Sequence, residues 1–130
     1  MRSTSGLGLG LLFGASLALA ACGGSGVGYD RPPASLDPSS PKLVANNIDF
    51  DVAEVDVPAG APFVLVFENG ENVGHNVSVY ADATYQTRLM EGVVFNGPAT
   101  RWYPVPSLAA GTYTFRCDLH PDMAGRLYAS

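Results

Sequence analysis

Seven consecutive residues near the C-terminus, Cys117 to Met123, contain a thiol, an imidazole and a thioether. Two residues separate Cys117 from His120, and two more separate His120 from Met123. Thiolate and thioether groups favour soft metal ions such as Cu(I), and imidazole binds copper and zinc. The segment therefore predicts a transition-metal site, and the rest of the chain must supply the elements that position it.

Alternation along two predicted strands brings a further ligand toward this site. Residues two apart in a strand face the same side of a sheet. In residues 112–117 the apolar positions end in Cys117, so the thiol is expected to face the core. In residues 75–81 the apolar positions share a face with His75, whereas Asn76 and the other polar residues are expected to face solvent. If these strand ends are neighbours, His75 and Cys117 meet.

The resulting set is two imidazoles, one thiolate and one thioether, which is the ligand set of a blue-copper electron-transfer site. Each residue alone has an ordinary structural explanation: a buried cysteine packs as a small hydrophobe, and a methionine fills a core. Their joint spacing favours a metal. Zinc bound by Cys117 and the two histidines, with Asp122 as fourth ligand, is an alternative, but it leaves Met123 without a purpose.

These residues resemble the cupredoxins, the small blue-copper proteins. The matching motifs are Asn69 with Gly74-His75-Asn76, and Gly111 to Gly125 with a short ligand loop of the amicyanin type. Over residues 42–130, the resemblance implies an all-β, eight-stranded Greek-key sandwich with one type 1 copper ion at its loop end. It also implies that Asn76 ties the His75 strand to the backbone beside Cys117. The implied copper ligands are His75, Cys117, His120 and Met123.

The pattern after Lys42 independently indicates an all-β sandwich, because short runs of Val, Ile, Phe and Tyr alternate with Pro, Gly, Asn and Asp. Residues 83–99 are expected to form a longer excursion that covers one end. The predicted strands are Leu43–Phe50, Ala53–Val57, Phe63–Glu68, His75–Ala81, Thr100–Val105, Tyr113–Cys117 and Gly125–Ala129.

The N-terminus predicts export and anchoring. Residues 1–21 have the layout of a secretory signal peptide, and Leu19-Ala20-Ala21-Cys22 resembles the bacterial lipobox, in which the cysteine carries the lipid. An ordinary signal peptide with an incidental Cys22 is the alternative. Residues 22–41 are rich in Gly, Ser and Pro and predict a flexible linker of about 24 Å as a coil or about 60 Å as extended polyproline. We therefore expect an extracytoplasmic, lipid-anchored domain at residues 42–130.

Composition limits the function. The net charge of −5 and the pI near 4.7 argue against nucleic-acid binding and favour a redox protein partner with a basic docking face. Two cysteines exclude a disulfide framework. With both histidines assigned to metal, no histidine remains as a general base for hydrolysis, so we expect an electron carrier rather than an enzyme. We expect the chain to be a monomer. A copper chaperone or sequestration module is the alternative. Asp118 and Asp122, which flank His120, are expected to point to water.

Overall fold

The computed structural model describes residues 26–130, so the predicted signal peptide and the predicted lipidation site, Cys22, lie outside the described residues. The described part of the chain consists of strands and loops, without a helix. Accordingly, no segment in it forms a helix that is long and apolar enough to cross a membrane.

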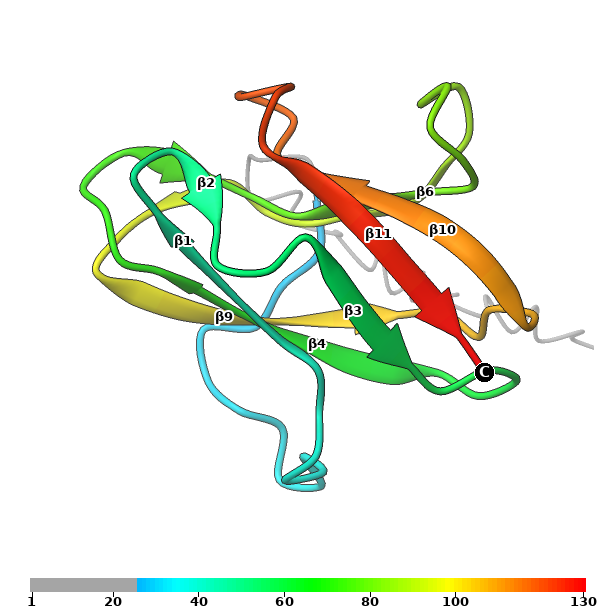
Figure 1. The fold of residues 1–130 in the computed structure, drawn as a ribbon. Coiled ribbons are helices and arrows are strands. Elements are labelled where there is room, and N and C mark those ends of the chain that lie inside the picture. Colours follow the sequence, from blue (N-terminus) through cyan, green and yellow to red (C-terminus); the bar gives the residue numbers. More distant parts are fainter. Residues whose placement is uncertain (1–25) are drawn as a thin grey trace, which may run out of the picture.

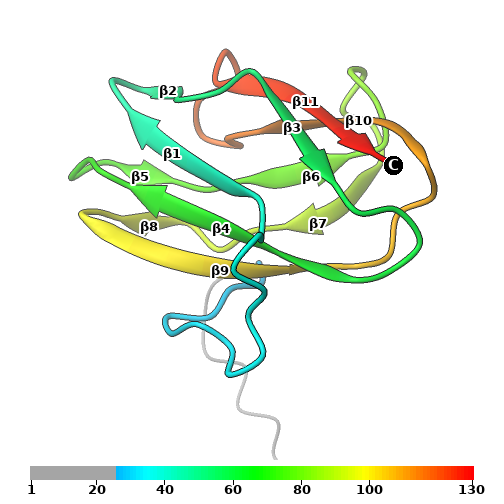
Figure 2. The same ribbon diagram turned by 60° about the horizontal axis from the view of Figure 1, so that its bottom comes forward.

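Two sheets form a sandwich, with their strands layered over each other in Figures 1 and 2. The first sheet has the order β2-β1-β4-β9 and the second has the order β3-β11-β10-β6-β7, while β5 and β8 form a separate short pair. Strands β1 and β3 pair in parallel with β4 and β11. The fold is therefore the all-β sandwich that the sequence predicts. The strands are β1 Lys42–Asn46, β2 Asp49–Phe50, β3 Glu54–Val57, β4 Phe63–Asn69, β5 Gly74–His75, β6 Ser78–Tyr80, β7 Arg88–Glu91, β8 Phe95–Asn96, β9 Ala99–Val105, β10 Gly111–Arg116 and β11 Ala124–Ala129.

Aromatic side chains fill the space between the sheets. Phe50 lies edge-on to Phe115 at 5.2 Å between ring centroids, and Phe67 lies edge-on to Phe95 at 5.5 Å. Such edge-to-face pairs stabilise a core by about 0.5–1.5 kcal/mol beyond the area they bury. Because Phe67 and Phe95 lie near the strand ends that carry the predicted ligands, the predicted metal site rests on a tightly packed aromatic core.

The predicted strand Leu43–Phe50 is broken by a tight turn. Asn47 and Ile48 both have φ of 55°, and the chain reverses so that β2 pairs antiparallel with β1. Two consecutive residues with positive φ characterise the type I′ hairpin turn, in which Asn is common but Ile is rare. The β-branched residue in the turn therefore made the segment look like one continuous strand.

The predicted excursion at residues 83–99 contains two strands. β7 pairs with β6 and β8 pairs with β5, so the excursion forms the outer arm of a hairpin. The inner arm, predicted as one strand at His75–Ala81, is interrupted between β5 and β6. This interruption places Asn76 and Val77 outside regular pairing, beside the metal-site residues.

Candidate metal centre

Three of the four predicted ligands meet at one end of the sandwich. His75 ends β5, Cys117 follows β10, and His120 lies in the loop between β10 and β11. Their Nδ1 and Sγ atoms all lie within 4.8 Å of one another. His75 and Cys117 are fully buried, as alternation along their strands predicts. Asp122 is exposed and does not belong to this group, so the described residues do not support the zinc alternative with Asp122 as ligand.

The spacing of the three donor atoms fits a single metal ion. The Cys117 Sγ atom lies 3.8 Å from Nδ1 of His75 and 3.6 Å from Nδ1 of His120. Metal–sulfur and metal–nitrogen bonds of about 2.3 and 2.0 Å at a trigonal angle would separate sulfur from nitrogen by about 3.7 Å. The thiol and the two ring nitrogens therefore already stand at the distances of a trigonal site.

Met123 lies next to this trigonal group because the ligand loop closes on itself. The Cys117 N–H donates to the Met123 carbonyl at 2.9 Å, and the Met123 N–H donates to the His120 carbonyl at 2.9 Å. The Met123 side chain is 1% exposed. The loop thus buries Met123 in the same short segment as Cys117 and His120, and the four residues together have the composition of a His₂Cys site with a methionine.

Glu71 fixes the ring of His75. Its Oε2 atom lies 3.0 Å from His75 Nε2 and also accepts a hydrogen bond from the Ile48 N–H at 2.9 Å. The Ile48 bond lowers the pKa of the Glu71 carboxyl, and the contact with His75 lowers it further against the opposing effect of burial. A metal bound at Nδ1 would keep the ring proton on Nε2, from which Glu71 would accept a hydrogen bond that sets the orientation of the ring.

Asn69 organises the loop that leads to His75. Its buried side chain donates to the carbonyls of Val73 and Phe95, at 2.8 and 2.9 Å, and accepts a hydrogen bond from the Glu71 N–H at 2.9 Å. One side chain therefore satisfies three backbone groups at the end of the sandwich. This arrangement holds both Glu71 and the β5–β8 pair in place.

Asn76 joins the His75 segment to the cysteine loop. Its Oδ1 atom accepts a hydrogen bond from the Asp118 N–H at 2.8 Å, and its Nδ2 donates to the Asp118 carboxylate and to the Gly92 carbonyl, both at 2.9 Å. Asn76 is 1% exposed, so the expectation from strand alternation that it faces solvent is wrong, and its contacts are those of the tie that the resemblance implies. It bridges the backbones next to His75 and next to Cys117.

The Asp118 carboxylate is the centre of a polar network, not a solvent-facing charge as predicted. It accepts hydrogen bonds from the hydroxyls of Ser78, at 2.5 Å, and Tyr80, as well as from Asn76. Arg88 and Arg116 lie 3.7 and 3.9 Å from its oxygens. Burial raises the pKa of Asp118, but the hydrogen bonds and the Arg88 charge outweigh burial and lower it. The carboxylate is therefore held in its charged form beside the thiol.

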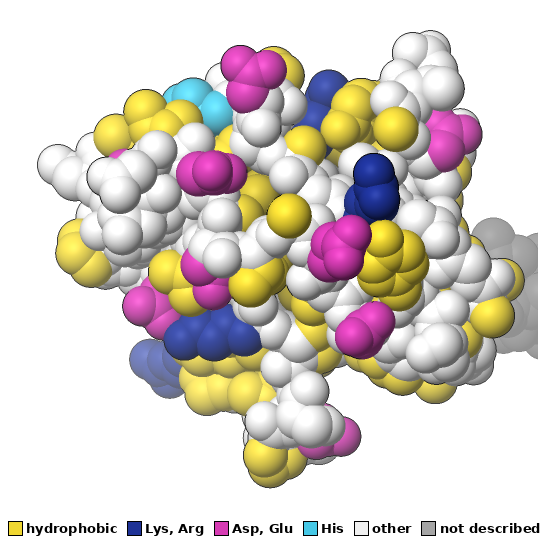
Figure 3. All heavy atoms as spheres, in the orientation of Figure 1, with side chains coloured by type: hydrophobic (Ala, Val, Ile, Leu, Met, Phe, Trp, Pro, Cys, Tyr) yellow, Lys and Arg dark blue, Asp and Glu magenta, His cyan; other side chains and the backbone are white. Residues whose placement is uncertain are grey.

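Among the described residues, His120 is the only histidine with solvent-exposed atoms, because His75 is fully buried. Figure 3 shows this histidine beside hydrophobic side chains. The side chains of Val94 and Leu119 both lie next to Gly74, at 3.3 and 3.6 Å from the position that a Cβ would take there, and they are 41% and 50% exposed. Val73, which directly precedes β5, is 40% exposed. We name Val73, Val94, Leu119 and His120 the histidine patch.

The fold and the site together define a class of protein: a small β-sandwich with a buried thiol between two imidazoles and a thioether beside them, which is the design of type 1 copper proteins. The sequence profile of the family described as "Cupredoxin-like domain" matches residues 15–129. The chain therefore belongs to the cupredoxin-like family.

Solved structures support the same fold. Reduced auracyanin from the photosynthetic bacterium Roseiflexus castenholzii superimposes with a TM-score of 0.61 at 17% identity, over 70% of this chain and 96% of that chain. Auracyanin A, a "blue" copper protein from Chloroflexus aurantiacus, gives a TM-score of 0.60 at 22% identity, over 70% and 98%. Amicyanin from Paracoccus versutus gives 0.57 at 20% identity, over 75% and 87%. A comparison with curated proteins gives no significant match.

Several residues around the site were missed by sequence analysis. Glu71 lies four residues before His75, and Ser78, Tyr80 and Arg88 come from β6 and β7. Glu71 had a local signal, because a carboxylate close in sequence to a metal-binding histidine is a common partner for its second nitrogen. The network around Asp118 had no local signal, since it depends on pairing between distant strands.

Proposed function

We propose that this protein is an exported, membrane-tethered type 1 copper protein that carries single electrons. The observation that carries the proposal is the near-trigonal group of Cys117 Sγ and two histidine Nδ1 atoms beside a buried methionine. Bound copper supplies a one-electron couple between Cu(I) and Cu(II). The proposed ligands are His75, Cys117, His120 and Met123.

The surroundings of the ligands suit a site that changes oxidation state without rearranging. His75 is held by Glu71, and Cys117 is held by the backbone bonds of its own loop. Asn76 and the Asp118 network connect the two segments. A buried, hydrogen-bonded ligand set resists movement, because each displacement breaks several contacts at once. This rigidity favours electron transfer over release of the metal.

The proposed domain organisation follows the sequence: a signal peptide at residues 1–21, lipidation at Cys22, a linker at 22–41 and the copper domain from residue 42. β1 begins at Lys42. Family membership is consistent with a location outside the cytoplasm. We propose anchoring to a bacterial membrane on the periplasmic or outer surface, with a redox protein as partner and the chain acting as a monomer.

Adding Cu(II) to the copper-free soluble domain is expected to produce an intense visible absorption from charge transfer between thiolate and copper. The absorption should disappear on reduction and return on oxidation, with the copper retained through gel filtration. A chaperone would instead release its copper to a competing chelator during the same cycle. A colourless adduct would contradict the type 1 site.

The histidine patch is the proposed contact surface for electron exchange, because it exposes a ligand edge among apolar side chains. We expect Leu119→Asp to slow electron self-exchange between the reduced and oxidised forms on the order of tenfold, because two patches that each carry a new charge repel. The measurement is line broadening in nuclear magnetic resonance of mixed samples. Ala61→Asp adds the same charge to an exposed site before β4 and should leave the rate unchanged. Equal rates in both variants would argue against this surface.

A further inference from the structure

The backbone of residues 26–29, here named the strap, joins the edges of the two sheets. The Val27 N–H donates to the Glu91 carbonyl in β7 at 2.7 Å, and the Val27 carbonyl accepts from the Val93 N–H at 2.9 Å. Tyr29 and Trp102 in β9 exchange both backbone hydrogen bonds, at 2.9 and 3.1 Å. Strand β7 ends one sheet and β9 ends the other, so the strap closes the side of the sandwich between two edge strands.

The glycines of the strap allow its close approach. Gly26 has φ of 115°, and a Cβ there would lie 2.7 Å from the Val93 nitrogen. A Cβ at Gly28 would lie 2.8 Å from the Val93 side chain and 2.9 Å from the Tyr103 ring. Both glycines therefore let the strap pack closely against the domain, although a glycine-rich composition alone suggests a flexible linker.

The strap also touches the backbone that supports the metal centre. Between Glu91 and Val93, which bond the strap, Gly92 donates its N–H to the Val77 carbonyl at 3.0 Å and accepts from Asn76 at 2.9 Å. A Cβ at Gly92 would lie only 2.4 Å from the Val77 oxygen. A continuous series of hydrogen-bonded contacts thus runs from the strap through residues 91–93 to Asn76, the residue that follows His75.

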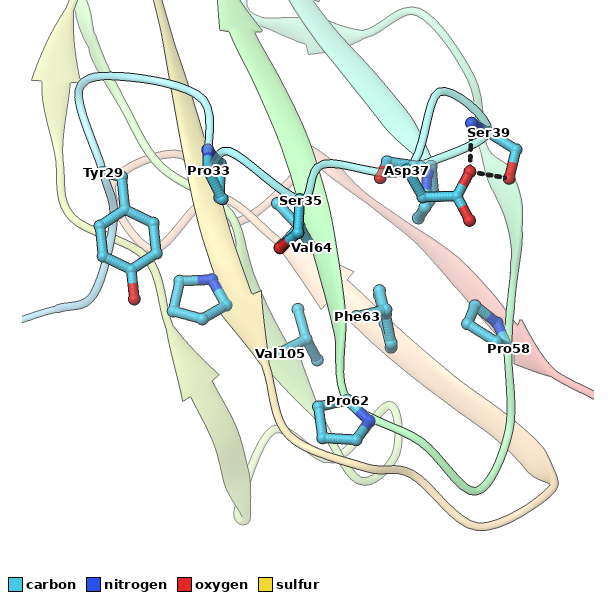
Figure 4. A pocket seen from close by; sticks show the side chains of 13 residues that line it. Tyr29, Pro33, Ser35, Asp37, Ser39, Pro58, Pro62, Phe63, Val64 and Val105 are labelled. Atoms are coloured by element: carbon cyan, nitrogen blue, oxygen red, sulfur yellow. Dashed lines mark hydrogen bonds between the residues drawn. The ribbon is translucent and has the colours of Figure 1, made fainter.

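The chain that follows the strap stays against the first sheet. In Figure 4, Pro33 and Ser35 lie over β9 and β4, and Tyr29 lies to the side of β9. Residues of this segment and of the two strands line a hollow of about 450 Å³. The Val66 N–H donates to the Pro41 carbonyl at 2.9 Å before β1 begins. This hollow lies at the Phe63 end of β4, opposite the end where Asn69 supports the metal centre. Contacts at both ends of the segment shorten the part of the linker that can act as a tether.

We propose that the strap holds the domain close to the membrane with the β7–β9 edge facing the lipid surface. This inference rests on the proposed lipidation of Cys22. Four residues lead from Cys22 to Gly26, and they reach at most about 14 Å even when fully extended. The whole linker from residue 22 to 41 would instead reach about 60 Å as extended polyproline. A docked strap therefore replaces a long tether with a short one.

The exposed side chains beside the strap suit a lipid headgroup region. Val27 and Tyr29 are 42% and 52% exposed, and Arg31 is also exposed. Tyrosine is enriched at membrane interfaces. Asp30 is exposed next to Arg31 and offsets its charge, so the apolar and aromatic side chains of the strap carry this argument. His120 is partly exposed on the ligand loop between β10 and β11, and the strap pairs with neither of these strands but with the backbone around β7 and with β9. This orientation leaves a ligand edge available to a partner.

Hydrogen exchange of the mature, lipidated, copper-free chain in phosphatidylethanolamine and phosphatidylglycerol vesicles tests the docking. The amides of Val93 and Trp102 donate to strap carbonyls, so both should be protected when the strap is docked. Gly26→Val should remove that protection, because the new side chain meets backbone atoms. Ala34→Val, at an exposed linker position, should retain it. If Gly26→Val fails to fold, Gly28→Val replaces it, because its Cβ meets only side chains.

The single tryptophan of the chain reports the orientation, because Trp102 pairs with the strap. Energy transfer from Trp102 to dansyl-labelled lipid headgroups should be strong in the wild type and in Ala34→Val. It should fall severalfold in Gly26→Val, in which the longer linker lets the domain move away.

Unprotected Val93 and Trp102 amides in the wild type would overturn the docked strap. Equal energy transfer in the wild type and Gly26→Val would overturn the membrane orientation. Mass spectrometry of the mature chain separates this result from a failure of the proposed anchoring. If Cys22 carries no lipid, the membrane orientation fails because the proposed anchor is absent. The hydrogen-exchange pattern still decides separately whether the strap docks on the domain.

Discussion

Cys117→Ser is expected to abolish the intense visible absorption of the copper-loaded protein. The absorption arises from charge transfer between a thiolate and Cu(II), and a serine hydroxyl stays protonated and offers a hard oxygen in place of the soft sulfur. Serine is close to cysteine in size, and its hydroxyl would face Nδ1 of His75 and His120, so the fold should survive. Absorption and electron paramagnetic resonance spectra of the Cu(II) form provide the measurement.

Asp122→Asn serves as the control for this experiment. Asp122 lies between His120 and Met123 but is exposed and outside the donor group, so its replacement should leave the colour intact. Strong colour in Cys117→Ser would mean that the ligand assignment is wrong. Loss of colour in Asp122→Asn would mean that the carboxylate takes part in the site.

The donor set could be predicted from the sequence because its information is local. Three donors lie within seven residues, and alternation along two short strands turns His75 and Cys117 toward the core. Alternation needs only the period of the strand and one apolar face, and both are visible in a single sequence. The same reasoning predicted the all-β class from runs of β-branched and aromatic residues.

The residues that surround the metal ligands could not be predicted, because strand alternation assumes that one face of a strand meets water. Ser78 and Tyr80 lie on the polar face of the His75 segment, yet both are buried. The Asp118 carboxylate, which comes from the ligand loop, folds back over this face and accepts their hydrogen bonds. Only the pairing of β6 with β10 and β7 reveals that contact.

The strap illustrates a second limit of composition. Glycine-rich segments lack the apolar area to fold alone, and residues 22–41 have that composition. Glycine also permits two backbones to approach closely, which is how Gly26 and Gly28 fit against Val93 and Tyr103. Composition does not distinguish these two uses, because the surface that receives the segment lies about 65 to 73 residues later in the chain.

Asp118→Ala is expected to lower the free energy of unfolding of the copper-free protein by about 3 kcal/mol. The substitution leaves the hydroxyls of Ser78 and Tyr80, both buried, without the acceptor they use in the wild type. Each buried donor that loses its partner costs about 1–3 kcal/mol. Arg116, which lies over the rings of Tyr80 and Tyr85, also loses its nearby carboxylate. Denaturation by urea at neutral pH, followed by circular dichroism, measures the change.

The same substitution should weaken copper binding by about 10–100-fold, because Asp118 connects the segment of His75 to the loop of Cys117 through Asn76. Asp118→Asn retains one acceptor oxygen and the shape of the side chain, so we expect it to lose less stability than Asp118→Ala. Asp122→Ala removes a carboxylate from an exposed position of the same loop and should change stability by no more than about 0.5 kcal/mol. If Asp118→Ala matched Asp122→Ala in both measurements, the carboxylate network would be a consequence of the fold and not one of its supports. A loss confined to Asp118→Ala, with partial recovery in Asp118→Asn, identifies hydrogen bonding to this carboxylate as the means by which the two ligand segments are held together.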